Sequence, residues 1–264
     1  MRELDIQEIK KICFEGMVYF KSFCEKHHLN YMLAFGTLLG AVRHGGFIPW
    51  DDDVDIWLPR ADYDRLMDLA KEYNNERWEL ISYKNTPGYF FPWMKIHDKR
   101  TQITPSRFTS GYVYGVSLDI FAIDNSDSSR YEDMQRIRAE YNTRIGWSGV
   151  MKGGDSFTER TKQSIRCVVS RYKYGSPKHI LDEYTDVLRN QKDTDWVCCS
   201  QCTVPNVWKR SLFADTTTLE FEGERFDVPI GYEEVLRHHY GDYMKLPPAS
   251  EQITHHWYKA YKVN

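Results

Sequence analysis

A cluster of acidic residues beside an apolar run is the strongest chemical signal in the sequence. Asp51, Asp53 and Asp55 alternate with other residues and lead into the apolar segment 56–58. Because successive side chains of a strand point to opposite faces, an extended chain here places these three carboxylates on one side. Carboxylates held so close repel each other unless a cation joins them, and Mg²⁺ or Mn²⁺ prefers oxygen ligands. The cluster therefore predicts a divalent metal site with Asp53 and Asp55 as ligands and Asp51 as a candidate for a further one.

Two other interpretations of the acidic cluster are weaker. A solvated acidic turn does not require apolar neighbours such as Trp50 and Ile56. A calcium loop of the EF-hand type needs glycine at its sixth position, where this sequence has Ile56, and glutamate at its twelfth, where it has Asp62. The metal site on a strand is thus the favoured interpretation.

A glycine–threonine pair precedes the acidic cluster. The strand-type run 31–35 is ended by Gly36 and Thr37. Glycine suits a place where backbone N–H groups approach a phosphate, because a Cβ would hold the anion away. Followed by Asp53 and Asp55, this turn is similar to the pattern of the nucleotidyltransferase superfamily. We therefore expect Gly36 and Thr37 to bind donor phosphates.

The segment 35–55, FGTLLGAVRHGGFIPWDDDVD, resembles the signature of the LicD family, bacterial phosphotransferases related to fukutin-type proteins. Further segments are similar to later blocks of the family, in the same order: KIHDKRT at 95–101, LDIFAID at 118–124, FEG at 221–223 with VP at 228–229, and YGDY at 240–243 with LPP at 246–248. His255 and His256 resemble a last block, which usually has a basic residue in place of Gln252 or Ile253. The resemblance spans nearly the whole chain, but the role of this tail does not follow from it.

The resemblance implies transfer of a phosphorylated group, best known as phosphocholine from CDP-choline, to a sugar of a surface glycan such as lipopolysaccharide, teichoic acid or capsule. An acceptor hydroxyl would attack the donor pyrophosphate in line while the metal neutralises its oxygens. Asp119 resembles the third superfamily carboxylate, so we expect it to bind the metal or act as a general base. Arg43 and Lys95 are the cations expected at the donor phosphates, with a surface charge as the alternative for each.

A choline group would need aromatic side chains. Its quaternary ammonium has no hydrogen-bond donor and is held best by ring faces. The candidates near the motifs are Trp50, Tyr112 and Tyr114. For each ring taken singly, packing in the core is the alternative role.

The elements expected to position these residues form a mixed sheet followed by helices. Strands are predicted at 31–35, 51–58, 78–83, 93–97 and 112–123, and helices at 9–28, 38–42, 61–73, 130–147, 158–173 and 177–190. We therefore predict an α/β (α+β) fold, with a nucleotidyltransferase-like sheet in residues 1–125 and a mainly helical continuation in residues 126–264.

Composition limits the partners and the cellular location that we expect for this protein. The 264 residues carry a formal net charge of −3, which argues against a nucleic-acid partner. The acidic start differs from a signal peptide, and no apolar run approaches the roughly 18 residues of a membrane span, so we expect a cytoplasmic protein with at most peripheral membrane contact. Cys198, Cys199 and Cys202 include a CxxC spacing, but a second ligand pair is missing nearby, so buried thiols are favoured over zinc.

Two rival functions remain open at this stage. A true nucleotidyltransferase, such as an antibiotic-modifying adenylyl transferase, would share the glycine–threonine turn and the acidic pair but would release pyrophosphate. A non-catalytic glycan-binding protein would not need the carboxylates for metal binding. The blocks 50–55 and 118–124 favour phosphotransfer of the LicD type.

Overall fold

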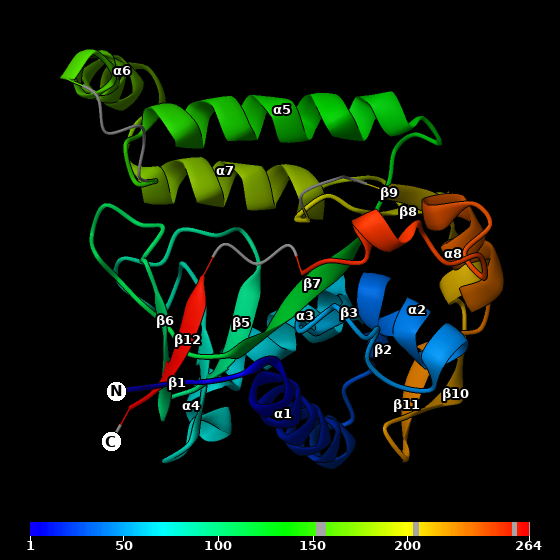
Figure 1. Cartoon of the computed structure of the whole chain (residues 1–264). Coiled ribbons are helices and arrows are strands. Elements are labelled where there is room, and N and C mark those ends of the chain that lie inside the picture. Colours follow the sequence, from blue (N-terminus) through cyan, green and yellow to red (C-terminus); the bar gives the residue numbers. More distant parts are fainter. Residues whose placement is uncertain (152–156, 203–205, 255–257, 264) are drawn as a thin grey trace.

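A seven-stranded mixed sheet forms the centre of the computed structural model, which describes residues 1–151, 157–202, 206–254 and 258–263 (Figure 1). The strands are β2 (Met32–Leu33), β3 (Asp55–Pro59), β4 (Trp78–Ile81), β5 (Met94–Asp98), β7 (Ser117–Asn125), β8 (Trp196–Cys199) and β9 (Asn206–Lys209). Their order is β2-β3-β7-β5-β4, and β8 pairs with both β7 and β9. β3 and β7 run parallel, whereas the other neighbouring pairs are antiparallel.

Helix α1 (Ile6–His27) covers one face of this sheet and contacts β5 and β7. It begins with a capping box, in which Asp5 accepts from the N–H of Glu8 and the Glu8 side chain accepts from the N–H of Asp5. Its buried apolar residues recur at helical spacing: Ile9, Cys13, Met17, Phe20, Phe23 and Cys24. Gly16 lets the helix lie close to β7, because an added Cβ would come within 2.7 Å of the Leu118 side chain.

The other helices are α2 (Phe35–His44), α3 (Arg60–Asp68), α4 (Ala70–Tyr73), α5 (Tyr131–Trp147), α6 (Phe157–Tyr174), α7 (Pro177–Arg189) and α8 (Tyr232–Tyr240), with short 3-10 turns η1 (Arg210–Phe213) and η2 (Ala249–Glu251). α7 contacts β7 and carries α5 on its outer side (Figure 1). The rings of Tyr141 and Tyr184 stack between them at 4.2 Å. α6 projects from the end of this pair.

Two small sheets complete the fold. β1 (Arg2–Glu3), β12 (Lys259–Lys262) and β6 (Thr101–Thr104) form one, which joins both ends of the chain (Figure 1). β10 (Thr216–Phe221) and β11 (Glu224–Pro229) form the other. In the turn between them, the carboxylate of Glu222 accepts from the N–H of Phe47. The late FEG block therefore lies against the RHGGF segment that precedes the acidic cluster.

The predicted α+β fold with a mixed sheet is confirmed, and the three helices predicted in the second half begin and end within two residues of their predicted bounds, whereas α8 was not predicted. Some bounds were wrong. The strand expected over 51–58 begins only at Asp55, the strand over 112–123 begins at Ser117, and the helix expected at 38–42 already begins at Phe35. The second half also adds strands β8–β12. Because β8 pairs with β7 and β12 with β6, both halves share sheets; the division at residue 125 stays a prediction.

Candidate active site

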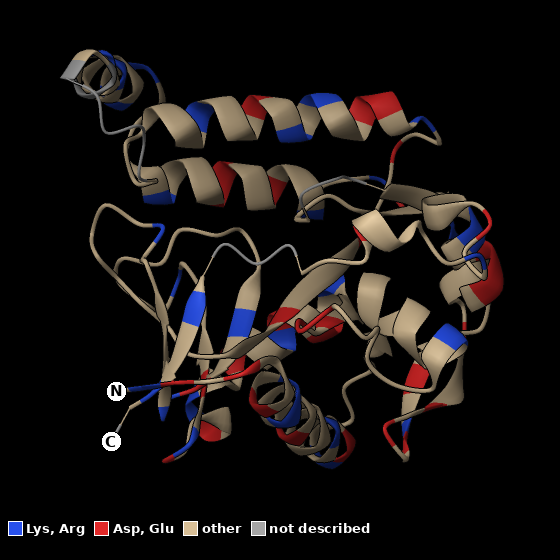
Figure 2. Ribbon diagram, in the orientation of Figure 1, with Lys and Arg blue, Asp and Glu red and all other residues tan. Residues whose placement is uncertain are grey.

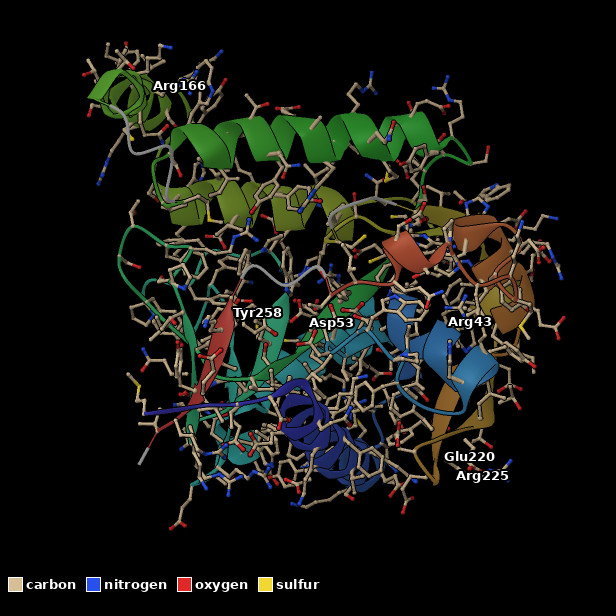
Figure 3. All side chains as sticks on the ribbon, in the orientation of Figure 1. Arg43, Asp53, Arg166, Glu220, Arg225 and Tyr258 are labelled. Carbon is tan, nitrogen blue, oxygen red and sulfur yellow. The ribbon has the colours of Figure 1, made fainter. Side chains whose placement is uncertain are left out.

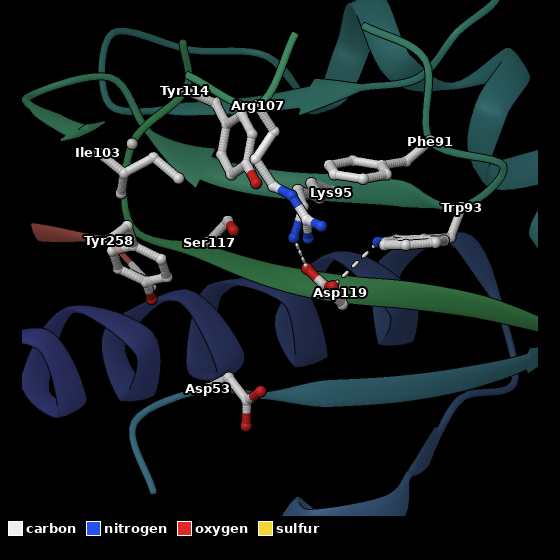
Figure 4. A pocket seen from close by; sticks show the side chains of 11 residues that line it. Asp53, Phe91, Trp93, Lys95, Ile103, Arg107, Tyr114, Ser117, Asp119 and Tyr258 are labelled. Carbon is white, nitrogen blue, oxygen red and sulfur yellow. Dashed lines mark hydrogen bonds and ion pairs between the residues drawn. The ribbon is translucent and has the colours of Figure 1, made fainter. Parts of the chain in front are cut away.

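Two parallel strands place Asp55 and Asp119 side by side. The register of β3 and β7 sets Asp55 opposite Asp119. The N–H of Asp119 also donates to the carbonyl of Val54 at 2.8 Å, which ties the segment before β3 to the same strand. Asp53 and Asp119 line one pocket (Figure 4). Carboxylates that are distant in sequence thus form one acidic centre.

The backbone that carries two of these acids differs from the predicted strand. Asp51 and Asp53 lie before β3, so the predicted alternation of a strand does not apply to them. They are nevertheless close enough to act on Asp55. Burial raises the pKa of Asp55 well above its usual value, and the negative charges of Asp53, Asp119 and Asp51 raise it further. The negative charge around Asp55 therefore exceeds what neighbouring cations neutralise.

A divalent ion would relieve this excess. Among the described residues, no group of three or more His, Cys, Asp or Glu side chains is arranged to hold a metal ion by itself. Mg²⁺ is, however, commonly held by one or two carboxylates, with waters and substrate phosphates completing its shell. Asp53 and Asp55 fit a site of that kind because Asp55 is a half-buried acid among other acids. The metal, and Asp51 or Asp119 as further ligands, stay predictions.

Asp119 is held by two side chains of the neighbouring strand. Trp93 Nε1 donates to its Oδ2 at 2.9 Å, and Lys95 forms an ion pair with its Oδ1. Lys95 lies opposite Asp119 in the register of β5 and β7. Burial lowers the pKa of Lys95, but the ion pair with Asp119 outweighs this effect and raises it. The ammonium is therefore charged, and it lies in the pocket where the sequence predicted a phosphate-binding cation.

A pocket of about 150 Å³ opens at Asp119. Its lining residues are Asp53, Phe91, Trp93, Lys95, Ile103, Arg107, Tyr114, Gly115, Ser117, Asp119 and Tyr258. Sequence reasoning missed Arg107, whose guanidinium reaches toward Asp119 between Tyr114 and Phe91 (Figure 4). The guanidinium carbon lies 6.0 Å from the ring centre of Phe91. The pocket thus combines two carboxylates, two cations and several rings.

The aromatic side of the pocket is only partly the predicted one. Tyr114 lines it as expected, whereas Trp50 and Tyr112 are absent from its described lining. Trp50 lies edge-on to His44 at 6.3 Å, and Tyr112 packs in an aromatic cluster with Tyr89. The rings that join Tyr114 in the pocket are Phe91, Trp93 and Tyr258, and the first two stack at 4.6 Å. The aromatic run at 89–93 was the signal that could have identified them.

Gly36 and Thr37 lie in the first turn of α2 and contact the acidic segment. The Thr37 hydroxyl accepts from the N–H of Asp55 at 2.9 Å. At Gly36, an added Cβ would come within 2.8 Å of Oδ2 of Asp51. The preceding Phe35 has a φ of 40°, a left-handed conformation that is costly for a bulky residue and is often found at functional sites. These contacts hold the acidic segment against α2; binding of phosphate there stays a prediction.

We expect Gly36→Ala to lower the turnover number by roughly tenfold, because the methyl group displaces the Asp51 carboxylate beside Asp53 and Asp55, and small misplacements in a catalytic centre are costly. Steady-state transfer rates would measure the effect. Gly146→Ala in α5 is the matched control, since its added Cβ meets no atom within 4 Å. Equal rates for Gly36→Ala and the parent would contradict the proposed closeness of α2 to the reacting groups.

The structure does not bring Arg43 into the described pocket. Arg43 lies in the last turn of α2, apart from Asp53 and Tyr258 (Figure 3). Its Nη1 donates to the carbonyls of Tyr243 and Lys245 at 2.9 and 3.4 Å. Arg43 therefore fastens the late YGDY block to α2, and a role at the donor phosphates finds no support in these contacts.

Cys198, Cys199 and Cys202 are buried, as predicted, and none of them forms a disulfide with another described cysteine. Burial raises the pKa of Cys198 and Cys199 well above the usual thiol value, which disfavours the thiolates that zinc requires. His255 and His256 lie outside the described residues. No described helix is both long and apolar enough to cross a lipid bilayer.

The matched sequences agree with this geometry. Residues 28–134 match the protein family described as "LicD/FKTN/FKRP, nucleotidyltransferase domain". The chain is 31% identical to the lipopolysaccharide cholinephosphotransferase LicD of Haemophilus influenzae, over 99% of both chains. It is also 44% identical, over 59 residues and 22% of both chains, to an uncharacterised protein of Rickettsia prowazekii.

The mixed sheet and the carboxylates that it places side by side define an enzyme with a nucleotidyltransferase-type domain. The matched region includes Asp53, Asp55, Lys95 and Asp119. The similarity to the Haemophilus influenzae protein extends this match over the whole chain. The chain belongs to the LicD family, as its motifs predicted.

Proposed function

We propose that this enzyme transfers phosphocholine from CDP-choline to a sugar hydroxyl of lipopolysaccharide in a reaction that depends on Mg²⁺ or Mn²⁺. The named cholinephosphotransferase that matches nearly the whole chain supports the headgroup and the acceptor. The observation that carries the chemistry is the pocket that Asp53 and Asp119 line together with Lys95, Arg107 and aromatic rings. Because CDP-choline is an intracellular donor, we place the reaction in the cytoplasm.

The charges of the pocket suit a pyrophosphate donor. The ammonium of Lys95 and the guanidinium of Arg107 offer hydrogen bonds and positive charge to phosphate oxygens. Asp53 and Asp55 would hold the divalent ion, which, when bound, neutralises oxygens of the transferred phosphoryl group. These residues thus bind and orient the donor while charge develops on the leaving CMP.

The acceptor hydroxyl must lose its proton as its oxygen bonds to phosphorus. The new P–O bond replaces the bond to the CMP oxygen, and CMP leaves with that electron pair. Burial raises the pKa of Asp119, against the opposing effect of Lys95, which makes Asp119 a stronger base than an exposed carboxylate. Asp119 is therefore our choice for the group that accepts the proton, with Trp93 and Lys95 fixing its orientation.

The rings of the pocket suit a quaternary ammonium. Lys95 Nζ already lies 5.1 Å from the ring centre of Tyr114, and Arg107 lies near Phe91, so these ring faces are directed toward cations. Phe91, Trp93, Tyr114 and Tyr258 replace the predicted set of Trp50, Tyr112 and Tyr114 as the proposed choline-contacting rings.

The test uses the purified chain with Mg²⁺ and an oligosaccharide acceptor from lipopolysaccharide. We expect CMP release and a product heavier by one phosphocholine group with CDP-choline, and loss of both on chelation with EDTA. CDP-glycerol in place of CDP-choline tests the headgroup, and teichoic-acid or capsular oligosaccharides test the acceptor. Pyrophosphate release from ATP without CMP formation from CDP-choline would overturn the proposal in favour of a nucleotidyltransferase.

A further inference from the structure

Helix α6 exposes an apolar stripe to solvent. Ile165, Val168, Val169 and Tyr172 lie at helical spacing on one side and are 61%, 73%, 43% and 96% exposed. In a globular protein such a stripe ordinarily faces the core. A contiguous exposed apolar face marks an interaction surface more often than single exposed residues do.

The opposite side of α6 makes the contacts with the rest of the protein. Ser170 is fully buried and its hydroxyl donates to the carbonyl of Arg144 at 3.5 Å. Gln163 Nε2 donates to the carbonyl of Gly146 at 3.1 Å, and the guanidinium of Arg144 lies 4.9 Å from the Tyr174 ring. The helix is therefore held on α5 by its more polar side, and its apolar stripe points outward.

Basic residues flank the stripe. Residues 160–174 contain five Lys or Arg and no Asp or Glu, although the whole chain has a net charge of −3. Lys162, Arg166, Arg171 and Lys173 are exposed. Around the helix at 100° per residue, Lys162, Arg166 and Lys173 fall on one flank of the stripe and Arg171 on the other. Figure 2 shows blue segments, which mark Lys and Arg, on α6, and Figure 3 shows Arg166 at the outer end of the molecule.

We infer that the outward face of α6 is a membrane-contact surface that lies on bilayers containing anionic phospholipids. A helix with an apolar stripe and Lys or Arg on its flanks inserts the stripe at the boundary between headgroups and acyl chains while the charges meet the lipid phosphates. A second copy of the chain is a poorer occupant, since two such helices would bring like charges together. This inference stands independently of the proposed reaction.

The test measures binding of the full chain to phosphatidylcholine vesicles with or without phosphatidylglycerol. We expect binding to the anionic vesicles and its loss at high salt. The triple variant Ile165→Gln/Val168→Gln/Tyr172→Gln should bind about tenfold more weakly, because less apolar surface is inserted. Replacement of Lys162, Arg166 and Arg171 by Gln should weaken binding by about fivefold per charge.

The matched control is Val187→Gln/Ile230→Gln, which removes exposed apolar side chains elsewhere and should bind as the parent does. Thermal unfolding of each variant checks its fold, and the transfer rate on a short water-soluble acceptor should be unchanged by the α6 variants, which separates this inference from the proposed reaction. Equal binding to both kinds of vesicle, or no binding to either, would overturn the inference of a membrane-contact surface. So would a dimer in light scattering that the α6 triple variant abolishes, since the stripe would then be a subunit interface.

Discussion

Asp55→Asn is expected to lower the turnover number by about a thousandfold, the upper range of the loss when an electrostatic contributor to the transition state is removed. Asparagine keeps the shape of the side chain but not the charge that a divalent ion requires. The carboxyl is half-buried on β3 opposite Asp119, at the centre of the acidic group. Steady-state CMP release at saturating CDP-choline measures the loss.

The same substitution should stabilise the metal-free protein at neutral pH. The folded-state pKa of Asp55 is raised, so the folded chain binds this proton more tightly than the unfolded chain does. Its ionisation therefore destabilises the fold above the folded-state pKa, and this destabilisation disappears as the pH falls below the ordinary value of 3.8. We expect Asp55→Asn to raise the Tm at pH 7 by roughly 2–4 °C for each kcal/mol regained, and to lose that gain in acid.

Asp227→Asn on β11 is the matched control, since burial also raises the pKa of Asp227 but the residue lies outside the described pocket lining. It should keep the parent's activity. A stability gain without loss of activity in Asp55→Asn would remove Asp55 from the reaction. A large fall in its Tm would instead show that the carboxyl is a structural group.

The acidic centre could be predicted because its signal is local. Asp53 and Asp55 lie in one short segment, and the apolar periodicity that predicted β3, β5 and β7 requires no knowledge of distant contacts. The start of β3 was missed because the acids before it bend with the loop that follows Pro49, instead of continuing the strand. The spacing of residues within this segment thus predicted the acidic centre, but not the backbone conformation of the segment.

The rest of the pocket depends on distant pairing. Tyr258 reaches the pocket because the segment that leads into β12 is fixed by the antiparallel pairing of β12 with β6. Arg107 comes from a loop with no periodic pattern. Arg43 has the side chain expected for a phosphate, but residues 243 and 245 accept its hydrogen bonds. No local pattern in the sequence predicts these contacts between distant residues.

Helix α6 illustrates a third kind of difference. Its period predicted a helix at 158–173, and the structure has one at Phe157–Tyr174. Periodicity locates an apolar stripe but not the direction in which the stripe points. That direction follows from tertiary contacts, here Ser170 and Tyr174 against α5, which leave the stripe outward.

Lys95→Met is expected to destabilise the protein by about 3–5 kcal/mol, the usual cost of leaving one partner of a buried ion pair alone. Lys95 is 7% exposed, and without it Asp119 would lose this ion pair while keeping the hydrogen bond from Trp93. Methionine preserves most of the volume, so the loss reports the missing charge and not a cavity. Urea unfolding of the parent and the variant measures it.

A double-mutant cycle separates the stabilising effect of the Lys95–Asp119 ion pair from that of packing. Asp119→Asn in the Lys95→Met background removes the stranded charge while the amide oxygen can still accept from Trp93 Nε1. We expect the double variant to regain at least about half of the lost stability, with a coupling of roughly 1–3 kcal/mol between the two positions. It should nevertheless remain inactive, because the base and one of the two phosphate-binding cations are missing. Strictly additive losses would mean that Lys95 and Asp119 contribute to the fold separately, and recovered activity would place the donor phosphates and the proton acceptor elsewhere in the protein.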